Sequence, residues 1–187
     1  GTFFPPLDVD LFPKEFRKMP RQYNENQAAI LRFIEDSAKV GDVIVVSNHL
    51  ELFGSTASPI PANHEQMVRK YFDTLGQFTS RMKKLEVNII LIGPMPFFPE
   101  LRKHLVNTFE CQQQWFQISD ANCWQSIQRQ QLVDSNKTID KFSKNWENSF
   151  DNGYYFEVFD YFCSPDHSNC SNNIDGAIYM YDQDHLN

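Results

Sequence analysis

The chain has 187 residues, enough for one domain with a substantial core but too few for two large domains. It is 41% hydrophobic, and its net charge of −7, without any run of lysine or arginine, argues against nucleic acid as a partner. No apolar stretch approaches the roughly 20 residues that span a bilayer, and the first residues lack the basic start of a signal peptide. We therefore expect a soluble domain, one that can belong to a longer protein.

Helical and strand patterns alternate in the first half of the chain. Apolar residues at helical spacing predict a helix over residues 24–40 and a longer one over residues 63–85. Continuous β-branched runs predict two strands buried on both faces, at residues 41–48 and from residue 87 to the stop at Gly93. The apolar stripe of the longer helix comprises Met67, Tyr71, Leu75, Phe78, Met82 and Leu85. This order of elements is typical of βαβ units in a parallel sheet.

The second half of the chain is less regular. The patterns indicate a short helix at residues 99–109 and a long one over residues 124–150, with Ile139, Phe142 and Trp146 spaced for burial. Two further strands are predicted, at residues 154–162 and, shorter, at residues 177–182. Because no repeat or linker divides the sequence, we expect a single α/β domain over residues 1–187 with a small parallel sheet.

The four cysteines form two pairs that are close in the sequence, Cys111 with Cys123 and Cys163 with Cys170. Two short-loop disulfides would fit an oxidising, extracytoplasmic compartment, and four reduced buried thiols are the alternative. The segment between Cys163 and Cys170 is rich in turn-forming residues, which favours a disulfide there. Neither a Cys-x-x-Cys motif nor histidines at metal-ligand spacing occur, so we expect no metal and no cofactor.

Polar residues follow the predicted strands. Ligands of open parallel sheets bind at the carboxyl ends of the strands, where Ser47 and Asn48 end one strand and a loop follows Ile92. The last predicted strand leads to Asp182 and His185. We therefore expect these side chains at one edge of the sheet.

The Asp-x-x-His pair suggests acid–base chemistry. Asp182 could accept the Nδ1–H of His185 and leave Nε2 free to act as a base, although an isolated pair of this kind is more often a surface feature. Asp184 competes as the partner of the imidazole but is poorly placed beside it in the sequence. The Asn48 amide could stabilise an oxyanion, or it could simply form a turn or cap a helix. No Gly-x-Ser-x-Gly or Gly-Asp-Ser nucleophile motif occurs in the chain, and Ser47 lacks flanking glycines.

These segments together resemble a known family. "DVIVVSNH", "VNIILIGPMP", "FCSPDHSNC" and above all "IYMYDQDHLN" are similar to the SGNH domain found fused to membrane-bound acyltransferase-3 proteins. The resemblance spans nearly the whole chain, and its C-terminal motif is the most specific part. It implies a three-layer α/β/α sandwich, similar to SGNH hydrolases and flavodoxins. It also implies that the Gly-Asp-Ser block with its strand precedes residue 1 and that a closing helix follows residue 187.

Site residues carry over from this resemblance one by one. His185 matches the catalytic histidine of the family and Asp182 the aspartate that orients it. Asn48 lies near the block that supplies an oxyanion-hole asparagine, although the usual Gly-x-Asn-Asp reads Val46-Ser47-Asn48-His49 here. Gly1 could match the oxyanion-hole glycine.

The resemblance implies acyl transfer to, or ester hydrolysis on, a carbohydrate, with a fused or neighbouring membrane acyltransferase domain as donor. The chain would lie on the extracytoplasmic side of a membrane, at the periplasmic or cell-envelope face, tethered to a membrane domain in the full-length protein. Two explanations remain open for the missing serine: the sequence is a fragment, or the domain is a natural relative that has lost its nucleophile. A non-catalytic carbohydrate-binding or interaction domain is therefore the rival hypothesis. A third hypothesis is an unrelated doubly wound fold, in which Asp182 and His185 would be surface residues.

Overall fold

The structure is a computed structural model, and the residues it describes are 29–30, 32–47, 64–98, 125–174 and 177–178. The chain divides into two compact units. The first comprises Gly1–Asn48, Pro61–Gly93 and Thr138–Phe156, and the second comprises His49–Ile60, Pro94–Lys137 and Glu157–Asn187. Each unit is described by itself below.

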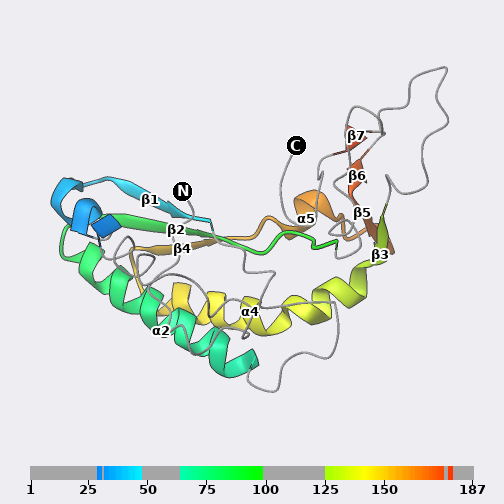
Figure 1. Cartoon of the computed structure of the whole chain (residues 1–187), viewed down its shortest axis with the longest axis horizontal. Coiled ribbons are helices and arrows are strands. Elements are labelled where there is room, and N and C mark those ends of the chain that lie inside the picture. Colours follow the sequence, from blue (N-terminus) through cyan, green and yellow to red (C-terminus); the bar gives the residue numbers. More distant parts are fainter. Residues whose placement is uncertain (1–28, 31, 48–63, 99–124, 175–176, 179–187) are drawn as a thin grey trace. The chain divides into compact units, whose positions relative to one another are not determined.

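The first unit contains a three-stranded parallel sheet (Figure 1). Its strands are β1 (Val43–Val46), β2 (Asn88–Ile92) and β4 (Gly153–Phe156), in the order β1-β2-β4. Val46 pairs with Leu91, and Leu91 pairs in turn with Tyr155. The predicted small parallel sheet is therefore present, and β2 is its central strand.

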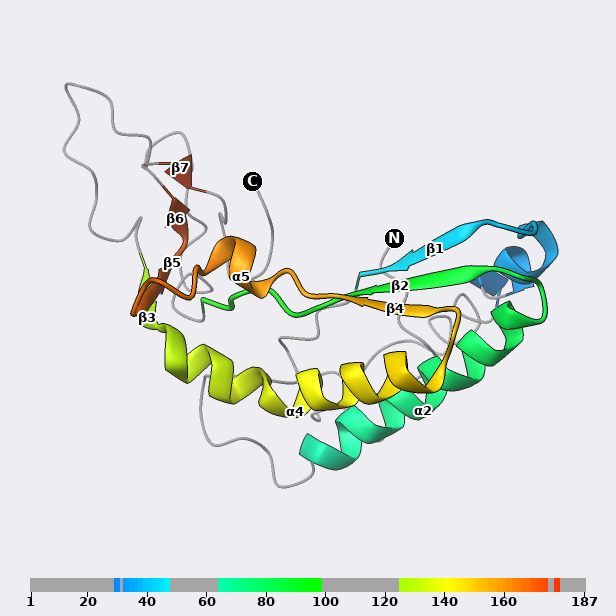
Figure 2. The ribbon, with the colours of Figure 1, turned by 180° about the vertical axis from the view of Figure 1, so that it is seen from behind.

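Helices cover one face of this sheet, as the front and back views show (Figures 1 and 2). Helix α2 (His64–Lys83) connects β1 to β2, and the second half of helix α4 (Arg129–Ser149) precedes β4. The predicted stripe is confirmed from Met67 to Met82, because Tyr71, Leu75, Phe78 and Met82 are at most 1% exposed. Leu85 lies beyond the end of the helix and is half-buried. The remaining core side chains of the sheet and of α4 include Val46, Ile89, Leu91, Ile139 and Trp146.

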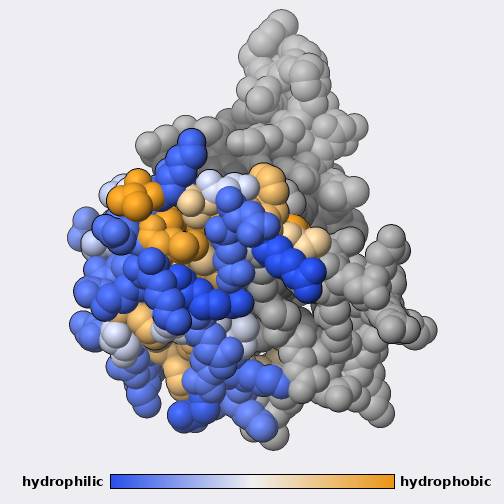
Figure 3. Space-filling model, turned by 90° about the vertical axis from the view of Figure 1, so that its left-hand side faces the viewer, coloured by the Kyte–Doolittle hydropathy of each residue, from blue (hydrophilic) through white to orange (hydrophobic). Residues whose placement is uncertain are grey.

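The opposite face of the sheet is open to solvent in the described residues. Val43, Val45, Tyr154 and Phe156 alternate with the residues that face the helices, and each is about half exposed, between 48% and 59%. The prediction that β1 is buried on both faces is therefore wrong, since only its helix-facing side is covered. Figure 3 shows hydrophobic residues at the surface among hydrophilic ones.

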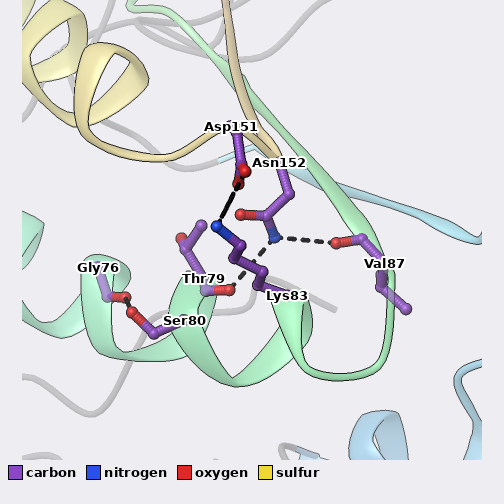
Figure 4. Close-up of polar contacts among 7 residues, drawn as sticks. All are labelled: Gly76, Thr79, Ser80, Lys83, Val87, Asp151 and Asn152. Carbon is purple, nitrogen blue, oxygen red and sulfur yellow. Dashed lines mark hydrogen bonds and ion pairs between the residues drawn. The ribbon is translucent and has the colours of Figure 1, made fainter.

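A group of buried polar side chains connects the amino-terminal ends of β2 and β4 (Figure 4). The Asn152 amide nitrogen donates to the carbonyl oxygens of Val87, at 3.0 Å, and Thr79, at 3.3 Å. The Trp146 indole N–H donates to the Thr79 hydroxyl at 3.1 Å. The backbone carbonyl oxygen of Asn152 also accepts the Ile89 N–H at 2.8 Å. Asn152 thus binds the residues just before and within β2 while it leads directly into β4.

The second unit contains two small antiparallel pairs of strands. Strand β3 (Ser126–Gln128) pairs with β5 (Asn169–Ser171), and β6 (Asn173–Ile174) pairs with β7 (Ala177–Ile178). The predicted disulfide between Cys163 and Cys170 is present.

Arg129 holds the neighbouring turn of the second unit in place. Its Nε donates to the Cys163 carbonyl oxygen at 3.2 Å, and its guanidinium forms an ion pair with Asp160. Its backbone N–H donates to the Ser168 carbonyl oxygen at 2.9 Å. The guanidinium also lies over the Phe159 ring, with its carbon atom 5.6 Å from the ring centroid.

Two strand predictions are corrected by this unit. The aromatic run at residues 154–162 was expected to be one strand, but the strand ends at Phe156 and a short helix, α5 (Phe159–Phe162), follows. The disulfide and the contacts of Arg129 hold this segment in a turn, whereas strand propensity acts only locally. In the predicted strand 177–182, Ala177 and Ile178 pair antiparallel with β6 and not with the parallel sheet, and the remaining residues lie outside the described part.

We predict that Asn152→Ala lowers the free energy of unfolding by about 3 kcal/mol, because it removes the two hydrogen bonds that the side-chain amide donates to the buried carbonyl oxygens of Val87 and Thr79. Urea denaturation followed by circular dichroism measures this. Asp151→Asn is the matched control one residue away. The Asp151 carboxylate accepts a hydrogen bond from Lys83, which lowers the pKa of that carboxyl, but the pair is exposed and its loss should change stability little. Equal effects of the two substitutions would contradict the role assigned to Asn152.

Candidate functional site at the carboxyl edge of the parallel sheet

Most of the site residues expected from the sequence lie outside the described residues. These are Gly1, Asn48, Cys111, Cys123, Asp182 and His185. Their roles, and the second disulfide, therefore stay predictions. Ser47, which precedes Asn48, and Ile178, which ends β7, are the described residues nearest to Asn48 and Asp182 in the sequence.

The carboxyl ends of the three parallel strands are level with one another. Val46, Leu91 and Tyr155 share one row of the sheet, so Ser47 follows in the row of Ile92 and Phe156. Ser47 is exposed. In sheets of this kind the loops at this edge carry ligand-binding groups. The chain therefore enters the segment with Asn48 from the edge at which the sequence predicted a site.

Gly93, directly after β2, makes a close contact at this edge. Its N–H donates to the Phe156 carbonyl oxygen at 2.9 Å, which extends the pairing of β2 and β4 by one residue. A Cβ added at Gly93 would lie 2.8 Å from the Tyr155 hydroxyl oxygen. A side chain here would displace the tyrosine, so the glycine is needed for space.

Two carboxylates hold Tyr155 in this position. Its hydroxyl donates to Asp140 Oδ1 at 2.7 Å, and its backbone N–H donates to Glu147 Oε1 at 2.8 Å. Both carboxylates come from α4, so the helix is connected to the carboxyl-terminal part of β4. Sequence reasoning did not single out these residues. The Gly-Pro step after an apolar strand was the available signal, because glycine at such a position often marks a close approach.

His64 is the first residue of α2, one position after the predicted start of this helix at residue 63. The residue is only 6% exposed, and its Nε2 atom has no hydrogen-bond partner among the described residues. Burial lowers the pKa of His64, and the neighbouring Glu65 carboxylate opposes this only in part. The imidazole is therefore neutral near pH 7, which also suits its place at the positive end of a helix.

Neither a metal centre nor a membrane span is found in the part of the chain that the structure describes. There, no three His, Cys, Asp or Glu side chains are grouped to hold a metal ion. None of the helices described has the length and apolar character needed to cross a bilayer.

A parallel α/β sheet with its candidate site at the carboxyl edge is the general plan of many enzymes and ligand-binding proteins. The comparison with family models narrows this class. The model of the SGNH domain (fused to AT3 domains) matches residues 3–187, and the chain belongs to this family of hydrolase- or acyltransferase-like domains. No curated protein and no solved structure matches the chain significantly. The family assignment made from the sequence motifs and the α/β fold are thus confirmed.

We predict that Gly93→Ala lowers the free energy of unfolding by about 1–3 kcal/mol, because the new methyl group overlaps the Tyr155 hydroxyl. Tyr155→Phe removes that hydroxyl together with its bond to Asp140. In the double variant the ring is free to move. The loss of stability in the double variant should therefore be smaller than the sum of the losses in the two single variants, as a double-mutant cycle measures. Strictly additive losses would show that the contact does not constrain the edge.

A second prediction concerns pH. The unfolded chain binds a proton at His64 near pH 6.5, whereas the folded chain resists protonation. Stability should therefore be complete above pH 7 and fall as the pH drops through 6.5 towards the lower pKa of the folded state. Urea midpoints at about pH 7.5 and 5.5 measure this. His64→Gln should reduce the difference between the urea midpoints at the two pH values. His167→Gln, at an exposed position, should leave that difference unchanged.

Proposed function

We propose that this chain forms part of an enzyme that transfers an acyl group to a carbohydrate hydroxyl or hydrolyses such an ester. The observation that carries this proposal is the family match over residues 3–187, which includes the C-terminal Asp-x-x-His. In the proposed mechanism, the nucleophilic serine comes from sequence outside these 187 residues.

The proposed chemistry follows the roles of a Ser-His-Asp triad. The serine hydroxyl attacks the carbonyl carbon of the donor ester while His185 Nε2 takes its proton. Asp182 accepts the Nδ1–H and so orients the imidazole. His185 then returns the proton to the leaving oxygen. In the second half, His185 deprotonates the carbohydrate hydroxyl, or water in hydrolysis, for attack on the acyl carbon. The bond from the serine oxygen to that carbon then breaks, and His185 returns the proton to the serine. Asn48, backbone N–H groups and Gly1 would stabilise the oxyanion.

The sheet supports this proposal by the direction of its strands. All three strands run to the same edge, and Asn48 is two residues beyond the end of β1. Tyr155 lies close to Gly93 at this edge and is bound to Asp140, and such packed support is what an oxyanion site requires.

The fusion recorded for this family supports membrane tethering and an acyltransferase domain as the partner. We propose that the membrane domain supplies the acyl group on the extracytoplasmic side of the membrane. The disulfide between Cys163 and Cys170 is in keeping with an oxidising compartment. A second disulfide between Cys111 and Cys123 is part of the same proposal.

A non-catalytic carbohydrate-binding domain is the second candidate. The observation that favours it is the lack of any Gly-Asp-Ser sequence in the 187 residues. The two candidates differ in one measurable property, the turnover of an ester.

We predict that a longer form of the protein with an upstream Gly-Asp-Ser hydrolyses p-nitrophenyl acetate, and that His185→Ala lowers kcat by about 10³-fold or more. Asp182→Asn should lower kcat strongly, because the imidazole loses its orienting partner. Asp184→Asn is the matched control and should retain activity.

The 187-residue chain alone should not turn over the ester. Full activity of this chain would contradict the assignment of the nucleophile to sequence outside it. A longer form that binds carbohydrate without cleaving the ester would favour the non-catalytic candidate.

A further inference from the structure

Two tripeptides of the chain have the acceptor pattern for N-linked oligosaccharides, Asn-x-Ser/Thr with x other than proline. They are Asn136-Lys137-Thr138 and Asn169-Cys170-Ser171. In a secreted protein this pattern marks an attachment site when it lies at the surface. The structure distinguishes the two asparagines, because one is buried and the other is exposed.

Asn136 is in the interior. It lies on α4 and is only 5% exposed, between Leu132 and Ile139 on the buried stripe of that helix. An oligosaccharide at this position would have to replace packed core, so the folded protein has no room for it.

Asn169 lies at the surface, at the start of β5. It is opposite Gln128 in the pairing with β3, and Ser126 is opposite Ser171. Because alternate residues of a strand point to opposite faces, these four uncharged polar side chains share one face. Ile127 and Cys170 are on the other face, where Cys170 is buried. The described residues of the face with Asn169 are therefore all polar, which suits an attached sugar.

The middle residue of the Asn169 tripeptide provides an independent observation. Cys170 forms the disulfide with Cys163, and disulfides of this kind form in oxidising, extracytoplasmic compartments. N-linked oligosaccharides are likewise added on the extracytoplasmic side of a membrane. The exposed acceptor and the disulfide thus point to the same cellular environment.

From the exposed asparagine, the polar face around it and the adjacent disulfide, we infer that Asn169 is an N-glycosylation site. The donor is an oligosaccharide linked to a lipid diphosphate. The Asn169 amide nitrogen attacks the first sugar carbon, a nitrogen–carbon bond forms, the bond from that carbon to the diphosphate oxygen breaks, and the amide loses one proton. The inference rests on the extracytoplasmic location given under the proposed function, but not on catalysis.

A glycan at Asn169 has a consequence for assembly. A bulky, hydrated chain keeps the face formed by Ser126, Gln128, Asn169 and Ser171 in solvent. The partner acyltransferase domain would then contact other surfaces of this chain.

The test is secretion of the protein from a eukaryotic cell behind a cleavable signal peptide. Peptide N-glycosidase should produce one shift in gel mobility, and peptide mass spectrometry should show Asn169 converted to aspartate. Asn169→Gln and Ser171→Ala should each abolish the shift, whereas Ser171→Thr should retain it. Thr138→Ala, which destroys the other tripeptide without changing Asn136, should leave the shift unchanged.

Secreted protein with the disulfide formed and Asn169 unmodified would overturn the inference. A glycan on Asn136 would overturn the argument from burial. Ester hydrolysis is measured separately, so a glycosylated but inactive protein would refute the proposed catalysis and leave the modification site established.

Discussion

The first unit depends on the alignment of its three parallel strands, which pack against helices α2 and α4. Parallel strands have no hairpin to align them, so contacts between the crossover connections must do this. Asn152 supplies these contacts, because it binds the carbonyl oxygens of Val87 and Thr79 and accepts the N–H of Ile89. Trp146 adds a bond to the Thr79 hydroxyl. These interactions set β4 level with β2 at their amino ends, and the carboxyl ends are level as a result.

The candidate site depends on this alignment at the other end of the strands. Gly93 continues the pairing of β2 with β4, and Tyr155 packs on it while bound to Asp140. Helix α4 thus packs against the carboxyl edge of the sheet, where Ser47 follows β1. In the proposed mechanism the reacting groups are on loops, which need a rigid scaffold to place them. The second unit has its own reinforcement in the disulfide and the contacts of Arg129.

Sequence periodicity predicted the helices better than the strands. The stripe from Met67 to Met82 was recognised because a long amphipathic helix repeats its signal over many turns. The run at residues 154–162 was read as one strand because its aromatic residues favour strands locally. The strand ends at Phe156 because Arg129 and the disulfide to Cys170 hold the following residues in a turn. Both partners lie outside the run itself, so its periodicity contains no information about them. The packing of Tyr155 on Gly93 was missed for the same reason.

By itself, the sequence determined the α/β class, the family and the Asp182-x-x-His185 motif. Each of these is written in local periodicity or in residues a few positions apart, and such patterns need no knowledge of distant partners. Only the tertiary structure decided that one face of β1 is open, that Ala177 and Ile178 pair outside the parallel sheet, and that Asn169 rather than Asn136 is exposed. Burial and strand pairing depend on what packs against a residue from elsewhere in the chain, and that is settled only when the whole chain has folded.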